Sequence, residues 1–193
     1  MLNKNDLMTL EAYAAVRPEF QRRARQHRRA RQVALGDHVT LCFEDRDTVH
    51  YQIQEMLYIE RHFEPQDIED ELAAYVPLIP TGTNFKATMM IEYPAPAMRA
   101  RMLQELMGIE HGVYVQVEGS ERVLAVADED LERSSQDKTS AVHFLRFELP
   151  LADRRALLAG AVLSLGVDHP RYAHHISELP DLVKNELIKD LRG

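Results

Sequence analysis

The sequence of 193 residues predicts an α+β fold, a mainly antiparallel sheet with helices packed at one face and at both chain ends. Strand-like segments are joined by short turns, and helical patterns gather towards the two termini, so regular alternation of strands and helices is absent. No repeat, low-complexity tract or linker interrupts the chain, and its length is ordinary for one domain. Residues 1–193 are therefore expected to form a single α+β domain.

The first thirty residues have a helical pattern. Leu7, Leu10 and Ala14 recur at helical spacing, and Pro18 suits the first turn of a second helix. After a turn at Gly36–Asp37, residues 38–43 alternate between apolar and more polar side chains. This alternation predicts a half-buried strand.

The segment over residues 48–63 fits two structures. Residues 48–53 alternate as a strand would, with a hairpin through residues 44–47 before them, but sixteen residues without Gly or Pro also fit a helix. We expect a helix from about residue 50. A helix opened by Pro65 and ended before Pro80 follows, then a strand over 85–93 and a helix over 98–106 closed by Gly108. Next come a hairpin of 113–117 and 123–127 around Gly119–Ser120, a polar loop over 128–138 and a strand over 141–149. A helix from Pro150, with 162–167 as its extension or as a strand, and a last helix from Pro180 complete the chain.

The composition is that of a globular protein, with 45% hydrophobic residues, 28% charged residues and a formal net charge of −8. These values exclude intrinsic disorder as the main state. The single cysteine, Cys42, permits no intramolecular disulfide and no usual iron–sulfur cluster, and is interpreted as a small strand residue. The start of the chain lacks a secretory signal pattern, and the longest apolar stretch, 156–167, is too short to span a bilayer. We therefore expect a cytoplasmic protein without membrane contact.

Residues 17–31 carry seven arginines against one acid, so this segment has a net charge of +6 while the remaining chain has −14. One interpretation is an anion site that binds phosphate, a phosphorylated ligand or an acidic partner. Its candidate residues are Arg22, Arg23, Arg25, Arg28 and Arg29. The preferred interpretation is a solvated helix whose arginines pair with an acid-rich stretch, because the acidic remainder of the chain disfavours nucleic acid. That stretch comprises Glu64, Asp67, Glu69, Asp70 and Glu71.

Three histidines and Asp168 lie within residues 168–175. Imidazoles and carboxylates suit zinc or non-haem iron, which need three or more convergent ligands, but the spacing matches no strong metal motif. The candidate metal ligands are Asp168, His169, His174 and, from an earlier helix, Glu55. The preferred alternative makes His169, which precedes Pro170, a turn residue whose ring bonds to the backbone.

A set of residues within 48–63 and the single residue His143 are the remaining candidates, and each has a structural and a functional interpretation. If residues 48–63 are helical, Tyr51, Glu55, Tyr58 and His62 fall on one line, and Glu55 and His62 are then ~10 Å apart along the axis. That separation favours a polar solvent face with one Glu–Arg pair over an acid–base or metal pair. His143 lies among apolar neighbours and is expected to be a core histidine with one satisfied nitrogen.

Four runs of the sequence resemble a bacterial domain family of unknown function: TLEAYAAVRPEFQRR, LGDHVTLCFEDRDTVHYQIQEM, SAVHFLRF and DHPRY. The resemblance extends over about residues 7–191, and the second run is the most specific. Members of this family are often encoded beside rubrerythrin-like proteins and cysteine-rich iron–sulfur oxidoreductases, which implies an accessory role in redox or oxidative-stress metabolism. The family has no established catalytic residues. The pattern residues carried over to this chain are Asp37, His38, Arg46, Gln52, Gln54, Glu55, Asp168, His169, Pro170 and Tyr172.

The leading hypothesis is a non-enzymatic accessory or binding protein with an iron–sulfur oxidoreductase or rubrerythrin-like partner. Because the chain lacks the thiols for a cluster, the resemblance implies a partner subunit and not an electron carrier. The alternative hypothesis is a metal-binding enzyme that holds iron or zinc at the His/carboxylate set. A third is polyanion binding through the arginine-rich helix. The sequence leaves the ligand, the metal and the oligomeric state open, a homodimer included.

Overall fold

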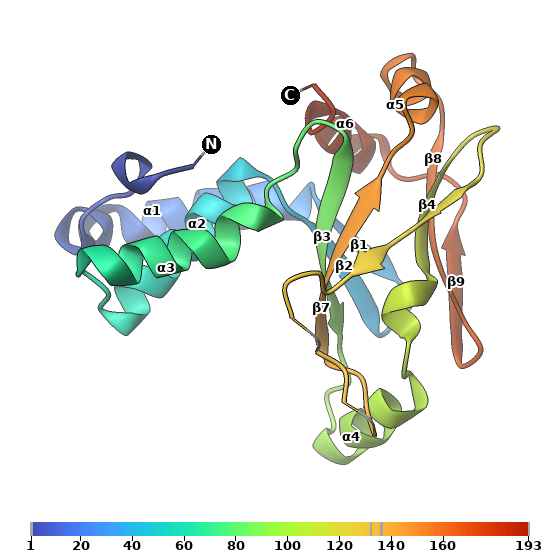
Figure 1. Ribbon diagram of the computed structural model, residues 1–193, viewed down its shortest axis with the longest axis horizontal. Coiled ribbons are helices and arrows are strands. Elements are labelled where there is room, and N and C mark those ends of the chain that lie inside the picture. The colour runs from blue at the N-terminus through green and yellow to red at the C-terminus, as the bar shows by residue number, and fades with distance from the viewer. Residues whose placement is uncertain (1, 132, 136, 193) are drawn as a thin grey trace.

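The computed structural model describes residues 2–131, 133–135 and 137–192, and consists of a β body with a helical arm projecting from its side (Figure 1). The helical arm comprises η1 (Lys4–Asp6), α1 (Leu10–Arg29), α2 (Arg46–Glu60), α3 (Pro65–Tyr75) and η2 (Val76–Leu78). Most of the remaining chain builds the β body. Both parts matter below, because the candidate site is lined by residues of the arm and of α6.

Two antiparallel sheets form the β body. The five-stranded sheet has the order β1 (Gln32–Leu35), β2 (Val39–Phe43), β3 (Asn84–Ile91), β7 (Val142–Glu148) and β6 (Val126–Ala127). The four-stranded sheet has the order β5 (Arg122–Leu124), β4 (Val113–Val117), β8 (Leu163–His169) and β9 (Tyr172–Ile176). Every strand pairing is antiparallel, which confirms the α+β prediction.

One segment passes from the four-stranded sheet to the five-stranded sheet. The predicted hairpin around Gly119–Ser120 is present, but its returning strand divides: Val123 pairs with Val115 of β4, whereas Ala127 pairs with Leu145 of β7. The division lets one short segment supply an edge strand to each sheet, so the two sheets are joined along that side.

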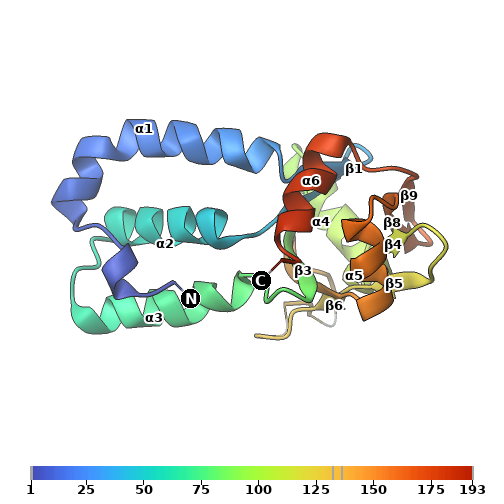
Figure 2. The same cartoon turned by 90° about the horizontal axis from the view of Figure 1, so that it is seen from above.

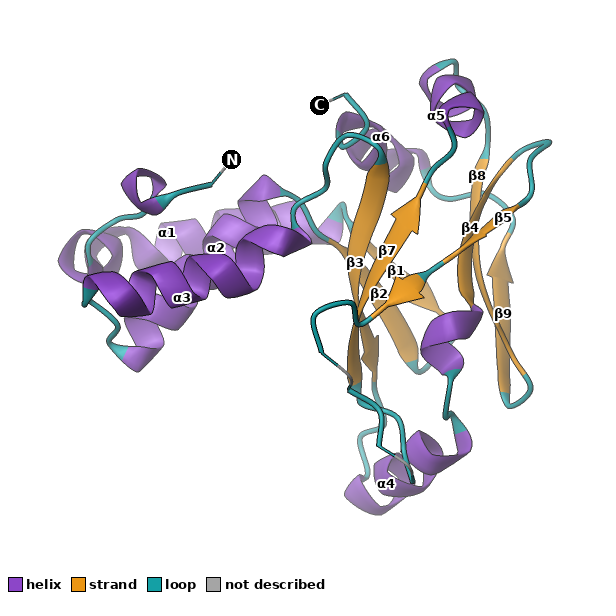
Figure 3. Cartoon of the chain, in the orientation of Figure 1, coloured by secondary structure: helices purple, strands orange, loops and turns teal. Residues whose placement is uncertain are grey.

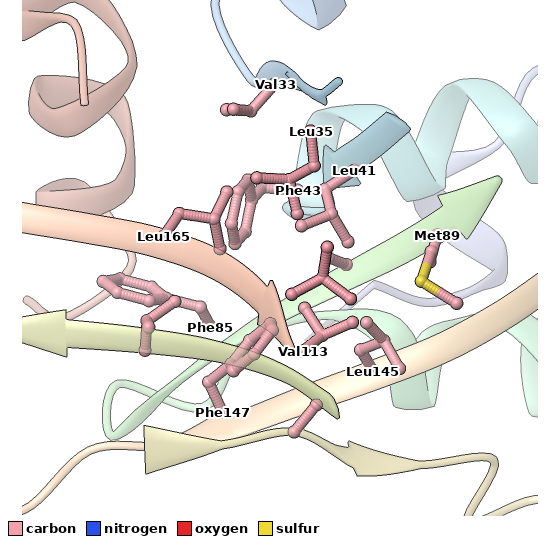
Figure 4. Packing of buried hydrophobic residues seen from close by; sticks show 14 of the residues in the cluster. Val33, Leu35, Leu41, Phe43, Phe85, Met89, Val113, Leu145, Phe147 and Leu165 are labelled. Atoms are coloured by element: carbon pink, nitrogen blue, oxygen red, sulfur yellow. The ribbon is translucent and has the colours of Figure 1, made fainter. Parts of the chain in front are cut away.

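The main hydrophobic core lies between the two sheets. Phe43, Phe85 and Phe147 of the five-stranded sheet face Val113 and Leu165 of the four-stranded sheet (Figure 4), and all five side chains are 0% exposed. Burial of apolar area stabilises the fold at roughly 25 cal/mol per Å². The inward faces are the apolar positions that alternate along each strand, which is why the strand pattern predicted them.

The prediction that the strand from residue 38 is half-buried is wrong. All five residues of β2 are buried, including Thr40 and Cys42 on the face expected to meet solvent. Val49 of α2 and Tyr75 of α3 line a small cleft over Cys42, so the helical arm covers this face. The cover comes from two helices that fold back over the strand, which the alternation within the strand does not report.

The helical arm has a hydrophobic cluster of its own. Leu2, Val49, Ile53 and Leu57 are buried there, with partly buried side chains from α3 packed against them. Figure 2 shows α2 between α1 and α3, with the three helices running side by side. The apolar face of α2 therefore holds the arm together.

The helical prediction for the segment from residue 50 is confirmed as far as Glu60, where α2 ends, and the competing hairpin is wrong. Asp45 caps α2, because its carboxylate accepts hydrogen bonds from the backbone N–H of Asp47 (3.0 Å) and Thr48 (2.9 Å). Thr48 returns the bond by accepting from the Asp45 N–H at 2.9 Å. This reciprocal cap fixes the helix start four residues before the predicted one.

Pro18 does not open a second helix, so that prediction is wrong. It lies inside the continuous helix α1 of 20 residues. A proline removes one backbone hydrogen bond, here to the carbonyl of Ala14. Both residues are exposed, so water hydrates the freed carbonyl and the helix continues.

Four shorter helical elements complete the β body: α4 (Pro96–Glu105), η3 (Ile109–Gly112), α5 (Leu151–Leu158) and α6 (Asp181–Lys189). Figure 3 shows α4 at one end of the body and α5 and α6 at the other. Residues 162–167, left open between helix and strand, lie almost entirely in β8. None of the helices in the described residues is long and apolar enough to cross a membrane.

Candidate anion-binding site

A cleft of about 580 Å³ lies between α1 and α2, where the helical arm meets the β body. We call it the α1–α2 cleft. Its lining residues are Phe20, Arg23, Ala24, Gln26, His27, Arg28 and Ala30 from the end of α1, Asp47, Thr48, His50 and Tyr51 from α2, and Glu186 from α6. The cleft therefore combines aromatic, cationic and hydrogen-bonding groups from three helices.

Aromatic rings form one wall of the α1–α2 cleft. The rings of Phe20 and Tyr51 are stacked, with centroids 6.1 Å apart and planes at 24°. Phe20 also meets the His50 ring edge-on at 5.6 Å. Such ring faces accept planar groups and cations.

Arg23 and Arg28 supply the positive charge of the cleft. Among the described residues, neither guanidinium group has a hydrogen-bond or ion-pair partner. Each guanidinium group offers five N–H donors in a planar fork that matches a carboxylate or phosphate. Asp47 and Glu186 line the same cleft with opposite charge, so the cations are placed locally and do not form a uniform basic surface.

His50 adds an unused polar atom. Its Nε2 is buried and has no hydrogen-bond partner in the described part of the chain. Burial, followed by the charge of Arg46, lowers the pKa of His50, so its ring is neutral at neutral pH. A buried polar atom without a partner is costly unless a ligand or water satisfies it.

The wall at the end of α1 is fixed by a charged network. His27 Nε2 lies 2.7 Å from Asp45 Oδ2, and Arg31 Nη1 lies 3.3 Å from the same oxygen. Arg31 is 1% exposed, donates to the carbonyls of Phe43 (3.0 Å) and Glu44 (3.1 Å), and pairs with Asp190. The network ties α1 to β2 and to the residue after α6, which holds the cleft open.

The arginines of residues 17–31 do not pair with the acid-rich stretch over residues 64–71, so that expectation is wrong. In the described part of the chain, their ion pairs are Arg17 with Glu55, Arg22 with Glu19, and Arg31 with Asp45 and Asp190. The acid-rich stretch belongs to α3, and α2 lies between α3 and α1 (Figure 2). The intervening helix keeps the two charged faces apart.

A second basic face of α1 lies beside the cleft. Arg22, Arg25 and Arg29 surround a shallow hollow of about 430 Å³ together with Pro18 and Gln26. The five arginines predicted to bind anions are thus divided into two in the α1–α2 cleft and three on this arginine face.

The structure does not gather the metal ligands predicted from the sequence. Among the described residues, Asp168, His169, His174 and Glu55 do not form a group with donor atoms within 4.8 Å of one another. Asp168 belongs to β8, and its carboxylate lies 3.3 Å from the guanidinium group of Arg122 on β5. This part of the β body is far from the helical arm that holds Glu55 (Figure 1). His169 Nε2 bonds to the Met107 carbonyl at 3.1 Å, as the turn interpretation predicted.

Glu55 has an interhelical role instead. Its carboxylate accepts from the Tyr13 hydroxyl (2.5 Å), from Arg17 (2.9 and 3.0 Å) and from Gln21 (3.3 Å), all on α1. The Arg17 hydrogen bonds are the main cause of the lowered pKa of Glu55. The Glu–Arg pair expected on a solvent face of this helix is therefore not the one observed: Glu55 pairs with Arg17 of α1 and lies between the two helices.

Comparison with known proteins identifies the family. Residues 1–191 match the family described as "Protein of unknown function (DUF3501)". The chain belongs to the DUF3501 family. It is also similar to a structure described as a crystal structure of a novel protein of unknown function from Burkholderia pseudomallei K96243, with a TM-score of 0.94 and 48% sequence identity over 98% of each chain. No curated protein matches the DUF3501 chain.

The family-pattern residues of this DUF3501 protein fasten segments to one another. Tyr172 donates to the Leu35 carbonyl at 2.6 Å and accepts from the His38 N–H at 3.0 Å. Gln54 bonds to both the N–H and the carbonyl of Met8, at 2.8 and 3.1 Å. Of the others, Arg46 pairs with Asp6 at 2.8 Å, Asp37 lies in the β1–β2 turn, and Gln52 lines the small cleft over Cys42.

Sequence reasoning missed most of a buried network around His143. Both ring nitrogens are satisfied: Nδ1 lies 2.6 Å from Asp128 Oδ2, and Nε2 lies 2.8 Å from Thr139 Oγ1. Thr139 also donates to Glu110 at 3.1 Å, and Ser134 donates to the same carboxylate at 2.9 Å. His143 and Thr139 are 0% and 1% exposed, so the network is closed to a substrate. It anchors a loop that the sequence marked only as polar.

Proposed function

We propose that this DUF3501 protein is a non-enzymatic accessory protein that binds a small anionic ligand with a planar group in the α1–α2 cleft. One observation carries the proposal: a single cleft holds two unpaired guanidinium groups, an unpaired imidazole nitrogen and a stacked aromatic pair. Arginine forks fit carboxylate and phosphate groups, and the rings fit a flat substituent. The cleft volume lies within the range of roughly 300–1,000 Å³ that small-molecule sites occupy.

A small ligand fits the charge distribution better than nucleic acid does. The chain has a net charge of −8, which repels a long polyanion, and the arginines of α1 are the local exception. A ligand that touches only the cleft meets Arg23 and Arg28 without crossing the acidic surface.

Isothermal titration calorimetry at low salt tests the proposed site with phenyl phosphate as the probe. We expect phenyl phosphate to bind more tightly than inorganic phosphate, and phenol to bind least, because both the anion and the ring contribute. Arg23→Gln and Arg28→Gln should each weaken binding by roughly tenfold or more, since a hydrogen bond to a charged group contributes about 1.5–3 kcal/mol.

Arg29→Gln is the matched control, because it removes the same charge from the same helix but outside the cleft. Equal weakening by Arg29→Gln and Arg28→Gln would mean that the helix attracts anions without a site. Absence of phenyl phosphate binding by the unmodified protein would refute the proposal outright.

The accessory role itself concerns a protein partner, for which the arginine face is the relevant surface. Arg22, Arg25 and Arg29 are exposed in a row on α1, and electrostatic complementarity to an acidic partner speeds association and selects the partner. The family resemblance favours an iron–sulfur oxidoreductase or a rubrerythrin-like protein as that partner, in the cytoplasm.

Co-purification under mild salt tests the partner. The unmodified chain should retain an iron–sulfur or rubrerythrin-like protein, and the triple variant R22E/R25E/R29E should release it. If neither chain retains such a protein, the accessory role fails while the ligand site stands. Light scattering on the same sample reports whether two copies of this chain associate.

A further inference from the structure

We propose that Glu60, His62 and Glu71 form a binding site for a divalent transition-metal ion at the outer end of the helical arm. One donor atom from each residue lies within 4.8 Å of the other two. These residues surround the turn from α2 to α3, away from the β body in Figure 2 and distant from the α1–α2 cleft. The inference does not depend on the proposed function.

The turn between the two helices brings the three side chains together. Arg61 ends α2 in the left-handed backbone region, with φ 60, and the His62 N–H donates to the Leu57 carbonyl at 3.0 Å. This C-terminal cap reverses the chain, so that His62 faces back towards Glu60 and across to Glu71 of α3. The Arg61 guanidinium group lies over the Tyr58 ring at 5.0 Å.

The donor atoms face one another at distances too long for hydrogen bonds. His62 Nε2 is 3.5 Å from Glu60 Oε2, and His62 Nδ1 is 3.6 Å from Glu71 Oε1. The Nδ1 atom is buried and has no hydrogen-bond partner in the described part of the chain. The two separations involve opposite nitrogens of one ring, and a single ion binds only one of them. With one donor atom from each residue the group spans up to 4.8 Å. Ligands ~2.0–2.2 Å from a shared ion are themselves ~3–3.5 Å apart, so the carboxylates rotate towards the nitrogen that binds the ion.

The electrostatics of the group also call for a cation. Two carboxylates face one imidazole, and among the described residues neither carboxylate has a guanidinium or ammonium partner. Glu71 has a side-chain exposure of 14%, and its burial raises its pKa, as do the charges of Glu60 and Asp70, while His62 opposes the rise. A divalent ion bound by the three groups removes this penalty.

The donor set selects the class of metal. One imidazole and two carboxylates suit Zn²⁺, Mn²⁺ and Fe²⁺, whereas Ca²⁺ and Mg²⁺ favour sites made only of oxygen ligands. Three protein ligands on a partly exposed turn leave the remaining positions to water. The competing occupant is a proton on His62, which would form an imidazolium between the two carboxylates.

Titration of the chelator-treated full chain with Zn²⁺, followed by calorimetry, tests the site. We expect one saturable ion per chain, with affinity lowered about tenfold or more by His62→Asn, Glu60→Gln or Glu71→Gln. Glu64→Gln and Asp70→Asn are matched controls, because they remove the same negative charge from neighbouring positions and should leave the affinity nearly unchanged. If the control variants weaken Zn²⁺ binding equally, the acidic turn attracts cations without a specific site, and the proposal is overturned.

A second measurement separates the metal ion from the proton. The His62 ring protons are followed by NMR with and without Zn²⁺, after circular dichroism confirms that the variants are folded. Bound Zn²⁺ should shift the His62 signals and displace any proton on the nitrogen that it binds, because the ion competes with the proton. If Zn²⁺ leaves the His62 signals unchanged while another histidine responds, the site is not the one proposed.

Discussion

The Tyr172 hydroxyl group lies 2.6 Å from the Leu35 carbonyl oxygen and joins β9 of the four-stranded sheet to the end of β1 in the five-stranded sheet. The Tyr172 hydroxyl oxygen also accepts a hydrogen bond from the His38 N–H at 3.0 Å, and these two residues are 134 positions apart in the sequence. Together with the strand that divides at Ala125 between β5 and β6, this contact joins the two sheets on a second side.

Tyr172→Phe should lower the free energy of unfolding by about 1–3 kcal/mol, because it leaves the buried Leu35 carbonyl and the His38 N–H without their partner. Urea denaturation followed by circular dichroism measures the change. Tyr75→Phe is the control, since the Tyr75 hydroxyl has no hydrogen-bond partner among the described residues. An equal effect of the two substitutions would assign the loss to the ring environment and not to the bond.

The Cys42 thiol should not react in the folded protein. The residue is 2% exposed, and burial, followed by the charge of Glu44, raises the pKa of the thiol to about 12, so the nucleophilic thiolate is scarce at neutral pH. A chromogenic disulfide reagent at pH 8 should label the native chain slowly and the chain in guanidinium chloride rapidly. Rapid labelling of the native chain, one equivalent within the mixing time, would contradict this prediction.

The His27–Asp45 pair should make stability depend on pH. The hydrogen bond to Asp45 raises the pKa of His27 in the folded state, so its contribution is fully present below the unfolded pKa of about 6.5 and is lost as pH rises through the folded pKa. Burial opposes ionisation of Asp45, but the hydrogen bond from His27 and the charge of Arg31 hold its pKa below the ordinary value.

His27→Gln should therefore cost on the order of 1 kcal/mol more at pH 6 than at pH 9. Unfolding curves of the two chains at both pH values give the difference. A cost that is identical at pH 6 and pH 9 would show that the proton on His27 contributes nothing to stability.

Elements that depend on local chemistry were predicted well. Residues 50–60 form a helix because Asp45 and Thr48 cap one another, and the cap is encoded within four residues. The strand over 85–91 follows from alternation, since Phe85 and Met89 face the core while Lys86 and Met90 lie on the other face. The turn at His169 is local as well, since its Nδ1 accepts from the Arg171 N–H at 3.2 Å, although its Nε2 bonds to the distant Met107 carbonyl.

The errors concern partners that are distant in sequence. The arginines of residues 17–31 are expected to pair with the acids of residues 64–71, whereas Arg31 pairs with Asp190, 159 residues away. His143 was identified as a core residue, but nothing local indicated that Asp128 and Thr139 would satisfy both of its nitrogens. The metal ligands grouped by proximity in sequence stay apart, because β8 and β9 form a hairpin that points their side chains to different neighbours.

The sequence by itself determined the α+β class, most elements of the β body and the concentration of positive charge between residues 17 and 31, because periodicity, caps and composition are properties of short segments. The tertiary structure alone decided which of those arginines are left without partners, that α2 separates α1 from the acids of α3, and that Glu60, His62 and Glu71 meet at one turn. The reason is physical: charge pairing and metal coordination act over a few ångströms of space, and only packing determines which distant residues come that close.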